Sequence, residues 1–169
     1  GPEGPAGSGA AVDLPAFEVW AVDQAGTESD GSGGLLYIWD GAEISENASE
    51  ATPEIIDLAD AAVAAGCEAP KKPHMVLPNH TSPKASHMVL ANVGSGDTFF
   101  INIASRSIVG CVNTVGGFNG AGGTANTHAS AGSPDNSMTI VANIGAKGES
   151  GFLHKIHTDY TNDEYKFVE

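Results

Sequence analysis

Short apolar runs, each bounded by glycine, asparagine, aspartate or serine clusters, recur along the chain from about residue 17 to its end. The runs are rich in β-branched and aromatic residues, which is typical of strands and not of amphipathic helices. Residues 58–66 (LADAAVAAG) differ, because they are rich in alanine and stop at a glycine, which predicts a short connecting helix. Strands are expected at residues 17–23, 35–40, 54–58, 74–77, 88–93, 98–103, 108–113, 138–144, 152–158 and 164–168.

An internal repeat organises these strands. The segment HMVLANVG at residues 87–94 matches MTIVANIG at residues 138–145, and in both an asparagine ends the strand before a glycine opens the turn. Upstream, PHMV at residues 73–76 matches THAS at residues 127–130. A third copy starts at residue 17 with FEVWAVD and lacks its first strand. The same order of strands and turns therefore occurs about three times.

A unit of four short strands that recurs every 40 to 50 residues or so is typical of a β-propeller blade. The fold class predicted is therefore all-β, with about three four-stranded antiparallel repeats. Residues 1–13 (GPEGPAGSGAAVD) are expected to form a flexible arm, and residues 14–169 a partial propeller. Its blades would span roughly residues 14–66, 67–118 and 119–169. A β-sandwich of several short strands is the alternative.

The repeated strand, VLAN at residues 89–92 and IVAN at residues 140–143, follows a turn that reads SPDN at residues 133–136. At these residues the chain resembles the YVTN-type β-propeller repeat family of exported bacterial seven-bladed propellers. The resemblance implies a propeller that acts in the periplasm or outside the cell. The strand lacks the tyrosine of the family, and three blades are fewer than the seven that the family implies.

The charge balance narrows the choice of partners. Lysine and arginine together number 7 against 21 aspartate and glutamate residues, which gives a formal net charge of −14. Such a chain does not attract nucleic acids or anionic lipid surfaces. The longest apolar run, near residues 59–66, is far shorter than the roughly 20 residues that cross a bilayer, so no membrane span is predicted.

Three histidines are the candidate metal ligands. His74 and His128 stand at equivalent places just before the innermost strand of successive blades, so both are expected at the same end of the central channel. His80 lies in the turn after the first of these strands. Three converging imidazoles would hold copper or zinc. The alternative is that each is a hydrogen-bonded turn residue, because no HExxH or CxxC spacing accompanies them.

Cys67 and Cys111 are the two cysteines of the chain. The resemblance to exported propellers favours a disulfide between them, because an oxidising compartment preserves such a bond. Two buried free thiols are the alternative.

The sequence contains no complete catalytic signature. No G-x-S-x-G motif occurs, and the sequence does not place a serine against a histidine and an aspartate, so no hydrolase triad is predicted. The first hypothesis is a non-enzymatic exported β-propeller segment that acts as a binding or assembly module. The alternative is a copper- or zinc-dependent redox propeller. Because three blades leave two open flanks, the partners expected are further copies of the chain or another chain that completes the propeller.

Overall fold

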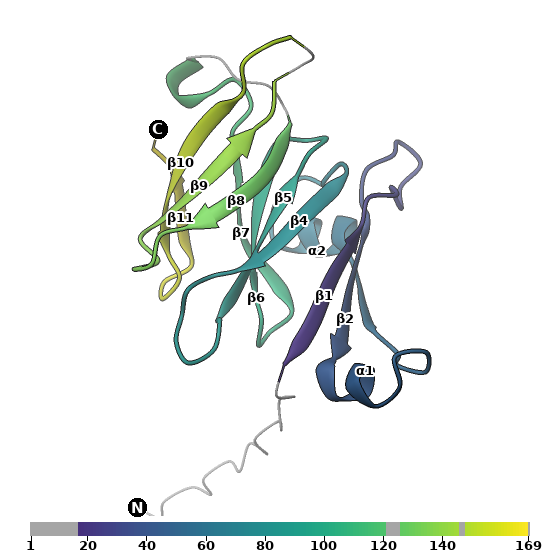
Figure 1. Ribbon diagram of the computed structural model, residues 1–169. Helices are drawn as coiled ribbons and strands as arrows, with labels where there is room; N and C mark the ends of the chain where they lie inside the picture. Colours follow the sequence, from purple (N-terminus) through teal and green to yellow (C-terminus); the bar gives the residue numbers. More distant parts are fainter. Residues whose placement is uncertain (1–16, 121–125, 146–147, 169) are drawn as a thin grey trace, which may run out of the picture.

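The computed structural model describes residues 17–120, 126–145 and 148–168, so the arm expected at residues 1–13 lies outside the described residues. The described strands form three antiparallel sheets, the first of three strands and the others of four (Figure 1). The strands are β1 (Glu18–Asp23), β2 (Leu35–Asp40), β3 (Glu54–Asp57), β4 (Pro73–Pro78), β5 (His87–Asn92), β6 (Asp97–Asn102), β7 (Ser107–Asn113), β8 (Thr127–Gly132), β9 (Met138–Asn143), β10 (Phe152–Asp159) and β11 (Glu164–Phe167). The helices are α1 (Gly41–Asn47), α2 (Leu58–Ala64) and the 3-10 turn η1 (Phe118–Gly120).

The three sheets are arranged as neighbouring propeller blades. β4 and β8, the first strands of the second and third sheets, contact each other, and the last strands β7 and β11 also contact each other (Figure 1). Because β1 packs against β4 as β5 packs against β8, the first sheet corresponds to the last three strands of a blade, as the repeat predicted. The all-β prediction of partial propeller blades is confirmed. Three sheets packed in series do not form the two facing layers of the alternative β-sandwich.

Local sequence explains where the elements begin and end. Helix α2 matches the predicted helix and is capped by Asp57, whose carboxylate accepts the backbone N–H groups of Ala59 and Asp60. Helix α1 was not predicted. Asp40 starts it, since its Oδ1 lies 2.7 Å from the backbone nitrogen of Ala42. The strand β8 was visible only through the repeat, because its sequence THASAG contains no large apolar residue.

Two hydrophobic clusters hold the sheets together. Leu36 and Leu90 are fully buried in the cluster between the first and second sheets. Phe100, Val141 and Ile156 are fully buried in the cluster between the second and third sheets. The second sheet is therefore covered on both faces, which explains why β5 and β6 are buried at nearly every position and lack a polar alternation. None of the described helices is long and apolar enough to cross a membrane.

Candidate functional site

His74 and His128 meet at one end of the inner strands. Each is the second residue of its strand, β4 or β8, so the repeat places them alike. Both are half buried, and their Nε2 atoms lie 3.0 Å apart. The amide nitrogen of Gln24, which follows β1, contacts Nδ1 of His74. Because an amide nitrogen only donates, His74 accepts at Nδ1, carries its proton on Nε2 and donates it to His128.

His80 does not join this pair. Its Nε2 lies 3.1 Å from the carbonyl oxygen of Gly132, and its backbone N–H donates to Asn136. Gly132 and His128 lie at opposite ends of β8, roughly 13 Å apart along an extended strand. Within the described ranges, no three His, Cys, Asp or Glu side chains converge as a metal site requires. Copper or zinc at the three histidines stays a prediction, and the structure brings two of the three together.

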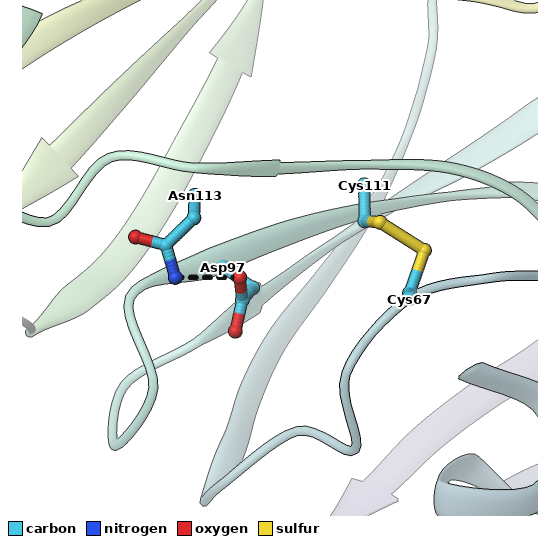
Figure 2. The surroundings of a disulfide bond; sticks show 4 residues. All are labelled: Cys67, Asp97, Cys111 and Asn113. Atoms are coloured by element: carbon cyan, nitrogen blue, oxygen red, sulfur yellow. Dashed lines mark hydrogen bonds between the residues drawn. A yellow bond between two sulfur atoms is a disulfide. The ribbon is translucent and has the colours of Figure 1, made fainter. Parts of the chain in front are cut away.

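Cys67 and Cys111 form a disulfide, with their Cα atoms 6.2 Å apart (Figure 2). Cys67 lies in the connection after α2, and Cys111 lies in β7. The bond therefore joins the connection between the first two sheets to the last strand of the second sheet. Nearby, the side chain of Asn113 donates to the buried carboxylate of Asp97 (Figure 2).

A second polar group, which the sequence did not predict, lies where the second and third sheets meet. Ser86 Oγ lies 2.8 Å from Nδ1 of His87, and Nε2 of the same ring lies 2.9 Å from Oδ1 of Asp163. Since a carboxylate oxygen accepts, the imidazole carries its proton on Nε2 and accepts the serine hydroxyl at Nδ1. Serine, histidine and aspartate are therefore joined in the donor order that an acyl-transfer triad uses.

The loop before β5 fixes the serine. Asn79 is buried, and its Oδ1 accepts the backbone N–H groups of Ser86 and His87 at 3.0 and 3.3 Å. Its amide nitrogen donates to Ser86 Oγ at 3.0 Å, and Oγ1 of Thr81 lies 3.1 Å from the same oxygen. The serine oxygen therefore accepts from the loop and keeps its own proton for the imidazole.

The aspartate comes from the hairpin turn between β10 and β11. Asp163 has a φ of 54°, a left-handed conformation that aspartate tolerates better than most side chains. Tyr165 donates its hydroxyl to the same Oδ1 at 3.1 Å, and its ring stacks on Phe100 at a centroid distance of 3.8 Å. A Cβ on Gly110 would lie 2.3 Å from Cδ2 of this ring, so only glycine permits the stack. Packing of the third sheet on the second therefore places the carboxylate.

The imidazole is buried, and the serine is reachable. His87 is 2% exposed, and the ring of Tyr160 lies 5.0 Å from it, centroid to centroid. Ser86 is half buried and lines two hollows of the surface. The first, of about 580 Å³, is lined by apolar side chains that include Trp20 and Met88. The second, of about 610 Å³, is lined by polar residues of the third sheet and its turns.

The sequence analysis did not find this hydrogen-bonded line of serine, histidine and aspartate. No sequence motif indicates it, because Ser86 and His87 are neighbours in sequence, which no nucleophile-elbow pattern describes, and because Asp163 lies 76 residues from His87. The sequence does contain one sign that His87 differs from its counterpart in the repeat. Aligning the repeats places His87 where the third blade has Met138, so a polar ring replaces an apolar side chain at the start of the same strand.

Comparison with known proteins gives a fold but no family. No protein-family model matches the sequence, and no curated protein is significantly similar to it. A solved structure from Bacteroides uniformis ATCC 8492, described as a putative 6-phosphogluconolactonase, has a TM-score of 0.55 and 11% identity, over 89% of this chain and 40% of that one. A structure from Bacteroides fragilis NCTC 9343 with the same description has a TM-score of 0.49 and 15% identity, over 96% of this chain and 44% of that one.

The chain therefore spans less than half the length of these solved structures. The likeness to the first of them shows a propeller-type fold, which agrees with the propeller part of the resemblance, while membership of the YVTN-type family stays a prediction. The expectation of a non-enzymatic binding or assembly module is contradicted, because the solved structure with the TM-score of 0.55 is described as an enzyme, a putative 6-phosphogluconolactonase.

Proposed function

We propose that the protein hydrolyses carboxylic esters, lactones included, with Ser86 as its nucleophile. The observation that carries the proposal is the hydrogen-bonded line from Ser86 through His87 to Asp163, with its serine end at two hollows. The description of the structural neighbours supports the same class of bond, because a lactone is a cyclic ester.

The acylation step follows from the order of the hydrogen bonds, in which Ser86 donates to His87 and His87 donates to Asp163. Ser86 Oγ attacks the carbonyl carbon of the ester while Nδ1 of His87 takes the hydroxyl proton. Asp163 accepts the Nε2–H of the ring and stabilises the imidazolium that forms. The carbon–oxygen bond of the ester then breaks, and His87 returns the proton to the leaving alcohol oxygen. The acid half of the substrate is left as an ester of Ser86.

Deacylation repeats these steps with water. Nδ1 of His87 takes a proton from water, whose oxygen attacks the acyl carbon, and the same proton then returns to the departing serine oxygen. One ester and one water yield one acid and one alcohol, or a single hydroxy acid from a lactone. Asn136 and Tyr160 line the polar hollow together with Ser86, and we propose that their side-chain N–H and O–H groups turn to the oxyanion when a substrate binds. Burial raises the pKa of Tyr160, so its hydroxyl stays a donor.

Replacement of the serine tests the proposal. The chain would be assayed in a pH-stat with p-nitrophenyl acetate and with D-glucono-1,5-lactone, as the parent sequence and as Ser86→Ala. We expect Ser86→Ala to reduce both rates to that of buffer, because the acyl-enzyme no longer forms. Diisopropyl fluorophosphate should add one phosphoryl group to the parent chain, and peptide mapping should locate it at Ser86.

Ser137→Ala is the matched control. Ser137 lines the same polar hollow, but its hydroxyl donates to Asp135 and contacts no histidine. This variant should still react with the fluorophosphate at Ser86, because the serine and its histidine are unchanged. Equal rates for the parent chain and Ser86→Ala, or a label on another residue, would overturn the proposal.

We further propose that the protein acts in the periplasm or outside the cell. The Cys67–Cys111 disulfide supports this location, because such bonds persist in oxidising compartments. The resemblance to exported propellers agrees with it.

A further inference from the structure

Ser86 lies at the junction of two hollows of opposite character. The hollow between the first and second sheets is lined mainly by apolar side chains, among them Phe17, Trp20, Met88 and Ile103. The hollow at the third sheet is lined by hydroxyl, amide and carboxylate groups and contains no lysine or arginine among its lining residues. An ester has two halves joined at the carbon that a serine attacks, so each half of a bound substrate faces one hollow.

The polar hollow is negatively charged. Asp135 accepts from the hydroxyls of Ser133 and Ser137, and these bonds lower the pKa of its carboxyl to about 2. Asp159 accepts from Asn162, which likewise lowers its pKa. Both carboxylates are therefore ionised at neutral pH, where the chain as a whole also carries a formal charge of −14. A phosphate group in this hollow would meet two anions and no lysine or arginine of the lining.

The other charged residues near Ser86 lie outside the polar hollow. Lys84 lines the apolar hollow together with Glu18, which is paired with Arg106. The guanidinium of Arg106 is also shared with Glu54 at 3.1 Å, so it is already compensated. His157 is the one lining residue of the polar hollow that can become a cation, and the carboxylate of Asp159 lines the same hollow.

We infer that the substrate of the Ser86 site is an uncharged ester that joins an apolar acyl group to a hydroxyl-rich alcohol, and that a phosphorylated lactone is a poor substrate. The inference rests on the proposed function, since it names the substrate class of the same serine. Hydroxyl groups of the alcohol would donate to the carboxylates and accept from the amide and hydroxyl donors of the polar hollow. The acyl group would displace water from the apolar hollow.

Three substrates test the inference. The chain would be assayed with octanoyl glucose, D-glucono-1,5-lactone and 6-phospho-D-glucono-1,5-lactone, with p-nitrophenyl acetate as the reference for the serine itself. We expect kcat/KM to be highest for octanoyl glucose, and roughly tenfold or more lower for the phosphorylated lactone than for its uncharged counterpart. Asp135→Asn combined with Asp159→Asn should narrow that gap, because the amides remove both negative charges.

Phe17→Ala tests the apolar half. Phe17 is 51% exposed, so its truncation leaves the buried cluster intact. The variant should raise KM for octanoyl glucose several-fold, and by more than it raises KM for p-nitrophenyl acetate, whose acetyl group is too short to fill the apolar hollow. Activity on p-nitrophenyl acetate together with equal rates on both lactones would overturn the inference and leave the proposed function standing. If the parent chain hydrolyses none of the four substrates, the proposed function itself is overturned.

Discussion

Asn143 and Asn92 occupy the same place in successive blades, yet only Asn143 has hydrogen-bond partners for its buried amide. Asn143 Oδ1 accepts from the hydroxyl of Thr127 at 3.1 Å, and its Nδ2 donates to Thr114 at 3.0 Å. The residue across the strand pair from Asn92 is Pro73, which has no hydroxyl, and both side-chain polar atoms of Asn92 are buried without a partner. Both blades thus have an asparagine at this place, but only in the third sheet does its side chain have hydrogen-bond partners.

Replacing each asparagine by leucine should show how much each side chain contributes to stability. Asn143→Leu leaves the buried hydroxyls of Thr114 and Thr127 without their amide partner, which costs about 2 to 4 kcal/mol of unfolding free energy. Asn92→Leu removes an amide that has no partner, so it should be close to neutral or stabilising. Urea unfolding of both variants measures the difference. Equal losses would show that the two amides contribute alike.

Asp97 should make stability depend on pH. Burial raises the pKa of its carboxyl above the ordinary value of 3.8, even though the side chain of Asn113 donates to it at 2.7 Å. The folded state then binds the proton of this carboxyl more tightly than the unfolded state does. The resulting contribution to the free energy of unfolding is complete below pH 3.8 and is lost as the pH rises through the raised pKa. Asp97→Asn should abolish that loss and unfold at higher urea concentrations at pH 7.

Urea unfolding between pH 3.5 and pH 7 measures this effect. The stability of Asp97→Asn relative to the parent chain should grow with pH and then level off. Asp159→Asn is the control, because hydrogen bonds lower the pKa of Asp159, and its contribution to stability is instead lost as the pH falls. A parent chain and Asp97→Asn whose stabilities differ by a constant amount would contradict the prediction.

Much of the fold could be predicted from the sequence because the pattern is local. Each apolar run between turn residues became a strand, and the repeat placed His74 beside His128 although they lie 54 residues apart. Helix α1 was missed because its signal is a single capping residue, Asp40, with few apolar residues after it. Cap residues also occur in turns, so one of them does not predict a helix.

The hydrogen-bonded line from Ser86 through His87 to Asp163 could not be predicted, because it depends on how two sheets pack. His87 begins a strand of the second sheet, and Asp163 lies in a turn of the third. They meet because Tyr165 stacks on Phe100 over the position of Gly110, a contact that no periodicity reveals. The sequence places residues within a blade, whereas tertiary packing decides which side chains meet between blades.

Removing the disulfide should destabilise the chain strongly. Cys67 and Cys111 are 44 residues apart, and in the chain-entropy model a closed loop of that length contributes about 4 kcal/mol to stability. Unfolding of Cys67→Ser combined with Cys111→Ser, compared with the parent chain with and without reductant, measures the loss. The parent chain should be two hydrogens lighter than its reduced form by mass spectrometry. Two thiols that alkylate in the native, unreduced protein would contradict the bond.

The outer faces of the first and third sheets should make the chain associate with itself. On the first sheet Val19 and Ile55 are 38% and 56% exposed, on the face opposite the buried Leu36. On the third sheet Leu153 is 74% exposed and Ile140 is 36% exposed, on the face opposite the buried Val141. Between the described blades, the corresponding face of a sheet is covered by the neighbouring sheet. A second copy of the chain can cover these two exposed faces in the same way.

Light scattering at micromolar concentration measures this association. We expect a mass above 17.1 kDa that rises with concentration, because the chain has two apolar faces that fit a head-to-tail contact. Leu153→Asp places a charge on the outer face of the third sheet and should shift the protein toward the monomer. Val63→Asp is the matched control: Val63 is 68% exposed but lies on α2, away from both faces, so this variant should associate like the parent chain. A stable, folded monomer at every concentration would show that these faces are not contacts between copies, and binding of a different chain would then be the role to test.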